Sequence, residues 1–226
     1  MTPGTSGAST APTTPATPAP AAGSRRMPEK RQAITRAAST VFGREGYTRA
    51  SVDAIAAEAG VSKRTIYNHF GDKEKLFLSV ALETADELTE VVAGLADRHL
   101  HKIVDLEADL TAFAVDRARA VLTAGDHYAL GRTIRAEAAN IPPDVLRAWL
   151  DAGPLASQRD LAAHFGRLAD QGLLHIEDAT LAATQFTLLT FSGAADATFF
   201  GAVPIAEEDL RNGITAGIKA FLRLYG

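Results

Sequence analysis

The chain contains 226 residues, of which 46% are hydrophobic and 22% are charged, and its net charge at pH 7 is −4. This composition is ordinary for a globular protein and disfavours a disordered or fibrous chain. The sequence has no cysteine, which excludes disulfide frameworks, thiolate nucleophiles and thiolate-ligated metal sites and fits a cytoplasmic location. The length allows one large domain or two small ones.

The two parts of the chain carry opposite charge. Residues 25–75 contain 11 Lys and Arg against 6 Asp and Glu, net +5, whereas residues 76–226 contain 12 against 21, net −9. A basic segment joined to an acidic remainder is typical of a protein in which one part meets phosphate. We therefore predict two domains with these bounds, the first of which approaches nucleic acid.

Residues 1–24 are almost entirely Ala, Thr, Pro, Ser and Gly, without a charge. Such a segment buries too little apolar surface to offset the entropy lost on ordering, so we predict a disordered tail. Prolines occupy the place where a secretory signal needs its apolar run, and no signal is expected.

Helical periodicity begins at Pro28 and continues through the chain, which predicts an all-α fold. The first helix ends between Gly43 and Gly46, because glycine favours helix ends. Its buried stripe follows intervals of three and four residues and consists of Ile34, Ala37, Ala38, Val41 and Phe42.

Two short helices follow. Ser51 is a suitable N-cap for one that ends at Gly60, and Ser62 is a suitable N-cap for a third helix that buries Ile66 and Phe70. The second helix presents Val52, Ile55, Ala56 and Ala59 to the core.

A longer fourth helix starts after Gly71 and Asp72 and carries Leu76, Phe77, Val80 and Leu88. Five more helices are predicted at about 103–123, 127–139, 142–171, 177–200 and 207–225, and Gly153-Pro154 can split the third of these. Residues 179–206 have one charge, Asp196, but their many Thr and Ser disfavour a membrane span. We interpret this stretch as a helix buried between two subunits.

The second and third helices, joined by a tight glycine-containing turn, form a predicted helix-turn-helix. The face of the third helix opposite Ile66 and Phe70 carries cations and hydrogen-bond donors, which suit a recognition helix in the major groove. These residues are Lys63, Arg64 and Asn68, with Thr65, Tyr67 and His69 at the edges.

The run SVDAIAAEAGVSKRTIYNHF at residues 51–70, with Lys73, Glu74 and Leu76 after it, resembles the signature of the TetR/AcrR family of transcriptional repressors. The resemblance extends from about residue 31 to 77 and includes Ala38, Phe42, Gly46 and Tyr47. AWLDAGP at residues 148–154 and TQF at residues 184–186 are similar to the C-terminal halves of many members. That second similarity says nothing of a ligand.

The resemblance implies an operator-binding homodimer that is released by a small-molecule effector. It implies that Tyr67, His69 and Lys73 lie along phosphates and that Ser51, with the backbone at the start of the second helix, holds the other strand. It also implies that base edges are approached by Lys63, Arg64, Thr65 and Asn68, and Ser62 is predicted to bind DNA beside them. The chemistry of the individual side chains supports these roles. Arg64 can form a bidentate contact with guanine and Asn68 with adenine, and Lys73 lies beside the N–H groups of a helix start.

Alternatives remain for several of these residues. Tyr67 can be a packing aromatic with an exposed hydroxyl. Four basic residues before the first helix can add an arm or phosphate contacts: Arg25, Arg26, Lys30 and Arg31. Arg25 and Arg26 can instead be solubilising charges beside the tail.

The acidic C-terminal domain is expected to hold the effector pocket and the dimer interface. Large side chains on its helices are candidate pocket walls, although such residues are more often core: Phe113, Tyr128, Ile134, Trp149, Phe165, Phe186 and Leu189. His127, Asn140 and Gln185 are candidate polar groups. We predict that the last two helices form a four-helix dimer interface.

No phosphate-loop, nucleophile-elbow, metalloprotease or dinucleotide motif is present, so no enzymatic activity and no cofactor are predicted. His99 and His101 are two residues apart and point in different directions on a helix, which disfavours a metal site. The remaining rival is a helical adaptor or structural protein that has kept the fold without specific operator binding. The residues do not distinguish repression from activation.

Overall fold

The computed structural model describes residue 1 and residues 22–122 and 126–226, with the side chains of residues 22–28 and 126–128 left out of that description. The described residues contain helices and no strand, which confirms the all-α fold. The helices are α1 (Ala22–Arg49), α2 (Val52–Ala59), α3 (Lys63–Phe70), α4 (Lys73–Leu100), α5 (Leu106–Leu122), α6 (Asp126–Ala136), α7 (Pro143–Ala152), α8 (Pro154–Asp170), α9 (Ala179–Thr187), α10 (Gly193–Ala197) and α11 (Glu207–Tyr225). A 3₁₀ turn, η1 (Ala138–Asn140), follows α6, and a π-helical segment, η2 (Leu188–Ser192), joins α9 to α10.

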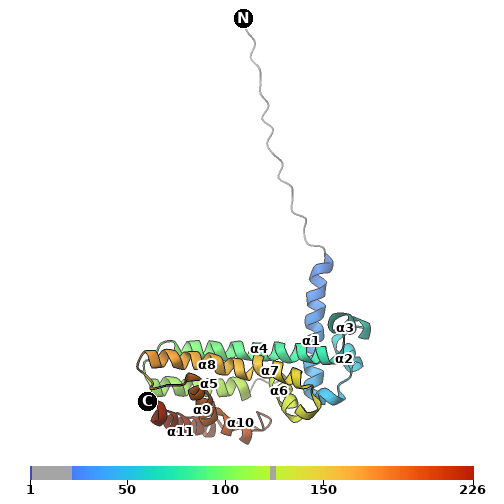
Figure 1. Ribbon diagram of the computed structural model, residues 1–226. Coiled ribbons are helices and arrows are strands. Elements are labelled where there is room, and N and C mark those ends of the chain that lie inside the picture. The colour runs from blue at the N-terminus through green and yellow to red at the C-terminus, as the bar shows by residue number, and fades with distance from the viewer. Residues whose placement is uncertain (2–21, 123–125) are drawn as a thin grey trace.

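Helices α1, α2 and α3 gather at one end of the molecule, and α4 runs from that end along the whole bundle (Figure 1). α4 packs against α5, α7 and α8, while α11 packs against α5 and η2. The long α4 therefore joins the helix-turn-helix end to the bundle.

The start of α1 differs from the prediction. The helix begins at Ala22, not at Pro28, and so includes the last three residues of the expected tail; residues 2–21 of that tail lie outside the described part. At the other end, Gly46 is non-helical (φ 84°, ψ 166°) and kinks the chain before Arg49. The predicted helix end therefore coincides with this kink.

Two hydrophobic clusters form the interior. The first joins the stripe of α1 to α2, α3 and the start of α4, and it also contains Leu130 and Ile134 of α6 and Val145 of α7. The second joins the far end of α4 to α5, α8, α9 and α11 around four buried phenylalanines, which are Phe113, Phe165, Phe186 and Phe221. Because α6 and α7 share the first cluster, the helix-turn-helix packs directly on the bundle.

The helix expected over 142–171 is split at Gly153 and Pro154, because the proline cannot continue the hydrogen-bond ladder of α7. Gly153 also lies against α4, where a Cβ would be 3.2 Å from Cβ of Ala85. The helix predicted at about 103–123 is α5, which spans Leu106–Leu122.

The helix predicted over 177–200 is present as a helical run from Ala179 to Ala197, in which the π-helical η2 lies between α9 and α10. The chain forms α9, η2 and α10 and leaves the helix after Ala197, where Thr198 donates its hydroxyl to the carbonyl of Ala194 at 2.7 Å. Phe199, Phe200 and Gly201 then adopt positive φ angles of 48°, 54° and 79°, which reverse the chain. Among the described residues, no helix is long and apolar enough to cross a membrane.

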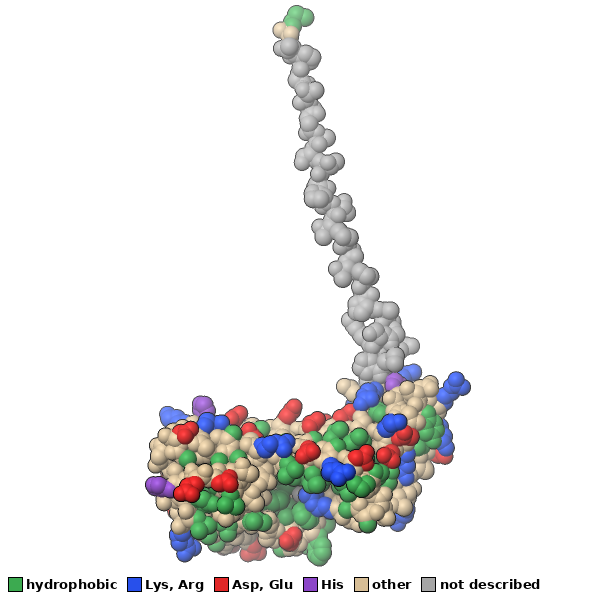
Figure 2. Space-filling view, in the orientation of Figure 1, with side chains coloured by type: hydrophobic (Ala, Val, Ile, Leu, Met, Phe, Trp, Pro, Cys, Tyr) green, Lys and Arg blue, Asp and Glu red, His purple; other side chains and the backbone are tan. Residues whose placement is uncertain are grey.

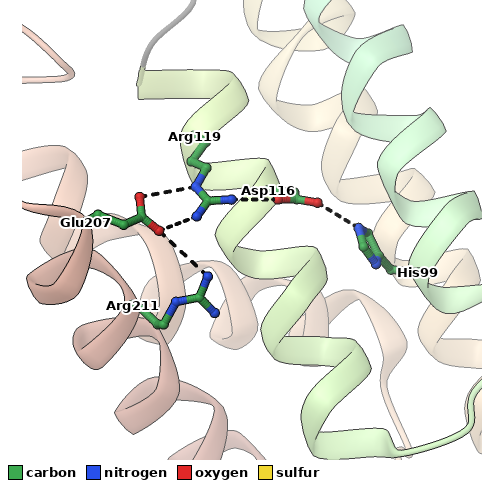
Figure 3. A network of polar contacts seen from close by, with 5 residues as sticks. All are labelled: His99, Asp116, Arg119, Glu207 and Arg211. Carbon is green, nitrogen blue, oxygen red and sulfur yellow. Dashed lines mark hydrogen bonds and ion pairs between the residues drawn. The ribbon is translucent and has the colours of Figure 1, made fainter.

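A polar network fastens α4, α5 and α11 at the surface (Figure 3). His99 of α4 contacts Asp116 of α5 at 2.9 Å, and Asp116 lies 3.2 Å from Arg119. Arg119 forms a bidentate contact with Glu207 of α11, which lowers the pKa of that carboxyl. His99 is thus directed at a carboxylate of the neighbouring helix.

Candidate DNA interface and ligand cavity

The two short helices begin and end at the residues that the sequence predicts. The Ser51 hydroxyl accepts the N–H of Ala54 at 3.0 Å, and the Ser62 hydroxyl accepts the N–H of Thr65 at 3.2 Å. Gly60 is left-handed (φ 63°, ψ 32°), a conformation that glycine adopts without the Cβ penalty. Ser51 and Ser62 therefore have capping roles in this structure besides the DNA contacts predicted for them.

The face of α3 away from the core carries the predicted reading residues. Ile66 and Phe70 are buried, whereas Lys63, Arg64, Tyr67 and Asn68 are exposed. Thr65 and His69 are partly exposed at the edges of this face. Lys and Arg side chains are visible over the α1–α3 end of the molecule (Figure 2). The structure therefore places the donors of α3 together on one side.

Lys63 is paired within the helix-turn-helix. Its Nζ lies 2.9 Å from Oδ2 of Asp53 on α2, and the hydrogen bond that it donates to this carboxylate raises the pKa of Lys63. Both side chains are exposed. A phosphate approaching Lys63 must compete with Asp53 for the same ammonium group.

The ammonium group of Lys73 contacts the end of α1. Its Nζ donates to the carbonyl of Thr48 at 3.3 Å and lies 4.9 Å from the centroid of the Tyr47 ring. Burial lowers the pKa of Lys73, against the opposing effect of Glu137. At the start of α4 the N–H of Lys75 is capped by Asp72 at 2.7 Å, so one donor expected to attract phosphate already has a carboxylate.

The basic residues before the helix-turn-helix differ in orientation. The guanidinium of Arg31 donates to Ser79 of α4 at 2.8 Å and lies 4.7 Å from the centroid of the Phe70 ring of α3. Lys30 is exposed. The side chains of Arg25 and Arg26 lie outside the described part of the chain.

A cavity of about 290 Å³ lies in the bundle, bordered by α4, α5, α6, α7, α8 and η2. Most of its wall is apolar and includes Leu88, Val92, Val121 and Leu130. Its polar wall residues include Arg117, Arg135 and Gln158. The amide of Gln158 donates to the hydroxyl of Thr184.

Of the seven side chains proposed as pocket walls, Trp149 lines this cavity. Phe113, Phe165 and Phe186 instead pack in the second core, where the rings of Phe165 and Phe186 are 5.2 Å apart. Helical spacing identifies such residues as buried, but does not separate a packed core from a cavity wall.

The other candidates also lie elsewhere. Ile134 belongs to the first core and Leu189 is exposed on η2, while Gln185 accepts a hydrogen bond from the hydroxyl of Tyr225 at 2.5 Å. Asn140 is exposed in η1. The side chains of His127 and Tyr128 lie outside the described part.

Sequence reasoning missed Arg117, Arg135, Phe191 and Phe200, which all line the cavity. The one local signal was the density of arginine within the apolar run of α5. Phe200 has a left-handed backbone (φ 54°), a conformation that costs a non-glycine residue about 1 kcal/mol and clusters at functional sites. The adjacent η2 is π-helical, another irregularity that is frequent at such sites.

Helix α6 connects the cavity to the helix-turn-helix. Arg135 lines the cavity, and two residues later the carboxylate of Glu137 accepts from the backbone N–H of Thr48 at 2.8 Å and from its hydroxyl at 2.7 Å. Gly46 allows this approach, because a Cβ there would lie 1.9 Å from Oε1 of Glu137. Gly46 and Tyr47 thus form the corner at the end of α1, where Glu137, directly after α6, contacts the chain.

The chain matches two sequence families in regions that together cover both halves. Residues 34–80 match the family described as bacterial regulatory proteins, tetR family, and the chain belongs to this family of transcriptional regulators. Residues 108–226 match the C-terminal domain of AefR-like transcriptional repressors, which places the bundle in a narrower group. TetR-family regulators bind operator DNA and small-molecule ligands and act as dimers.

Individual relatives agree with this assignment. The transcriptional repressor AcnR of Corynebacterium efficiens is 43% identical over 63 residues, which are 28% of this chain and 34% of AcnR. The match thus spans about a third of that relative's length. A TetR-family regulator of Mesorhizobium loti has the same fold with a TM-score of 0.81 and 30% identity, over 89% of this chain and 98% of the other. The flavonoid-responsive regulator FrrA has the same fold with a TM-score of 0.66 and 30% identity, over 88% of this chain and 97% of FrrA.

Proposed function

We propose that this chain is a homodimeric repressor that binds a palindromic operator through α2 and α3 and leaves it when a small molecule fills the bundle cavity. Residues 25–75 serve as the reading domain and residues 76–226 as the sensing and dimerising domain. The observation that carries the proposal is that α6 lines the cavity and that Glu137, the residue directly after α6, contacts Thr48 at the corner that leads into α2.

The reading face consists of Arg64 and Asn68 toward base edges, with Lys63 and Thr65 beside them. Ser51, Ser62, Tyr67 and His69 border this face and contact phosphates. Lys73 donates one N–H to the Thr48 carbonyl, and its two remaining donors are assigned to a phosphate.

Ligand release follows from the shared helix. A ligand that displaces Arg135 shifts α6, and Glu137 carries the shift to Thr48 and the start of α2. The recognition helices of a dimer must lie about 34 to 36 Å apart, or a multiple of this, to enter successive major grooves. A ligand that changes this separation weakens operator binding, and the operator weakens ligand binding by the same factor.

The partner interface lies on the last helices. Apolar side chains are exposed there, among them Leu188 at 60% and Phe199 at 71%, and hydrophobic atoms are visible at the surface over α10 and α11 (Figure 2). Large exposed apolar groups that lie together mark interaction surfaces. We assign this face to the second subunit.

Operator binding is tested with the best fragment from a genome-wide binding experiment. Its affinity should exceed that for scrambled duplex and fall with rising salt, because phosphate contacts release counterions. Arg64→Met should reduce the preference by about 1 to 3 kcal/mol, whereas Arg98→Met on exposed α4 surface should leave it unchanged. Equal affinity for the fragment and for scrambled DNA would favour the helical adaptor instead, and increased transcription of the bound genes would identify an activator.

A further inference from the structure

The charged residues of the cavity wall have one sign. Arg117 on α5 and Arg135 on α6 both line it, and the described lining residues include no Asp or Glu. Arg117 is partly buried, and Arg135 is exposed and so lies toward the mouth. A cavity with cations and low-dielectric walls concentrates electrostatic attraction on an anion.

Aromatic rings hold both guanidinium groups against the wall. Cζ of Arg117 lies 5.4 Å from the centroid of the Phe191 ring, and its Nη1 donates to the Thr187 hydroxyl at 3.1 Å. Cζ of Arg135 lies 5.0 Å and 4.4 Å from the ring centroids of Trp149 and Phe200. Cation–π contacts restrict these long side chains before any ligand arrives, and this reduces the entropy lost when they bind an anion.

The remaining wall favours a hydrocarbon body of limited size. Leu88, Val92, Val121 and Leu130 supply apolar surface. The volume of about 290 Å³ lies at the small end of ligand pockets.

We infer that the effector of this cavity is a small apolar carboxylate, whose anionic group is bound by Arg117 and Arg135 and whose hydrocarbon body fills the apolar part. The inference rests on the proposed function of the cavity as the effector site. Carboxylates and guanidinium groups form charge-assisted, frequently bidentate hydrogen bonds, and a cation of similar size is disfavoured by the two like charges.

Calorimetry on the full chain tests the ligand class with three probes of similar size: 1-naphthoate, its neutral amide 1-naphthamide, and phenyltrimethylammonium. We expect naphthoate to bind about ten- to hundred-fold more tightly than the amide, the range that a charged hydrogen bond supplies. The cation should not bind measurably. Equal binding of acid and amide, preferential binding of the cation, or no binding of any probe would overturn the inference.

Variants of the two arginines distinguish the effect of their charge on ligand binding from the effect of their packing. Arg117→Met and Arg135→Met keep an apolar stem, and each should weaken naphthoate about ten-fold or more while leaving naphthamide unchanged. Arg98→Met is the matched control and should change neither. Thermal melts check that each variant folds. An equal loss for acid and amide would show that the arginines act through packing alone and would contradict the inference.

Operator binding distinguishes this inference from the proposed function. If naphthoate binds with the expected dependence on both arginines but does not release operator DNA, the ligand class holds and the release mechanism fails. If the chain binds its operator specifically but none of the probes binds the cavity, the ligand class is overturned while the function in DNA binding stands.

Discussion

Asp53 places a negative charge on the surface that we assign to DNA. It pairs with Lys63 at 2.9 Å and therefore offsets one of the cations of α3. In the free protein this pair restrains the Lys63 side chain. In the DNA complex that we propose, the same carboxylate lies near phosphates and opposes them, so the pair limits affinity.

Asp53→Asn should increase operator affinity several-fold at low salt, because it removes a repulsive charge and frees Lys63 for a phosphate. The slope of log affinity against log salt should steepen by about 0.9, the value for one additional phosphate contact. Fluorescence anisotropy over a salt series measures both quantities. Glu107→Gln, an exposed acid at the start of α5, serves as the control and should leave the slope unchanged; an unchanged slope in Asp53→Asn would contradict the assignment of Lys63.

Glu137 fixes the corner at Thr48. Burial alone would raise the pKa of its carboxyl, but hydrogen bonds from the Thr48 hydroxyl and N–H, with Arg49 and Lys73 nearby, outweigh burial and lower it. A carboxyl whose folded pKa is lowered stabilises the fold above its unfolded pKa, about 4.3, and this stabilisation is lost as the pH falls through the lower folded value.

Glu137→Gln should reduce the free energy of unfolding by about 1 kcal/mol at pH 7. The difference between wild type and variant should shrink between about pH 5 and pH 3, because the wild-type carboxyl becomes protonated there. Urea denaturation at fixed protein concentration measures this difference in the free energy of unfolding at each pH. Glu90→Gln on the exposed face of α4 is the control. A difference that stayed constant down to pH 3 would show that the charge of Glu137 has no role in the contact.

Helix ends in this protein depend on single residues with defined geometry. Ser51, Gly60 and Ser62 set the bounds of α2 and α3 through caps within four residues along the chain. In contrast, the pairing of α11 with η2 depends on contact between residues far apart. Gly217 lies where a Cβ would be 2.1 Å from the carbonyl oxygen of Leu189, so only glycine permits this close approach of the two backbones.

Gly217→Ala should destabilise the fold by about 2 to 4 kcal/mol, because the clash forces α11 away from η2. Gly213, one turn earlier on the same helix, meets nothing within 4 Å at its Cβ position. Gly213→Ala should therefore stabilise the helix by about 0.5 to 1 kcal/mol. Thermal and urea denaturation compare the two variants, and similar stability for both would contradict the close packing of α11 on η2.

The molecule as a whole separates three tasks along α4. Its first turns pack with the helix-turn-helix, its middle lines the cavity and its last turns pack with the helices that carry the exposed apolar face. Occupation of the cavity can thus affect the spacing of two reading domains only if a second subunit fixes the opposite end. This makes dimerisation a requirement of the mechanism.

Leu188→Glu or Phe199→Glu should give monomers with poor operator affinity, because a carboxylate buried between two subunits lacks a partner. Val104→Glu places the same charge on an exposed apolar residue outside the last helices and should leave a dimer. Analytical ultracentrifugation measures the mass of each variant, and fluorescence anisotropy measures its operator affinity. Unchanged sedimentation mass in both interface variants would refute the assignment of this face.

Local patterns predicted the reading end of the protein well. The caps at Ser51 and Ser62, the left-handed Gly60 and the burial of Ile66 and Phe70 all follow from interactions between residues at most five apart. The start of α1 at Ala22 was not predicted, and neither was the reversal at Phe199–Gly201. That reversal brings Gly201 so close to Leu122 that a Cβ would be 2.2 Å from its carbonyl oxygen.

The helical class, the helix-turn-helix and the donor face of α3 were already determined by the order of residues, because periodicity and capping act along one helix. The tertiary structure alone decided that Lys63 pairs with Asp53, that Lys73 contacts the Thr48 carbonyl and that two arginines line the cavity. Each of these depends on which face of one helix meets another, and residues distant in sequence fix that choice. For the same reason Phe113, Phe165 and Phe186, equally apolar in the sequence, became core, whereas Trp149 came to line the cavity.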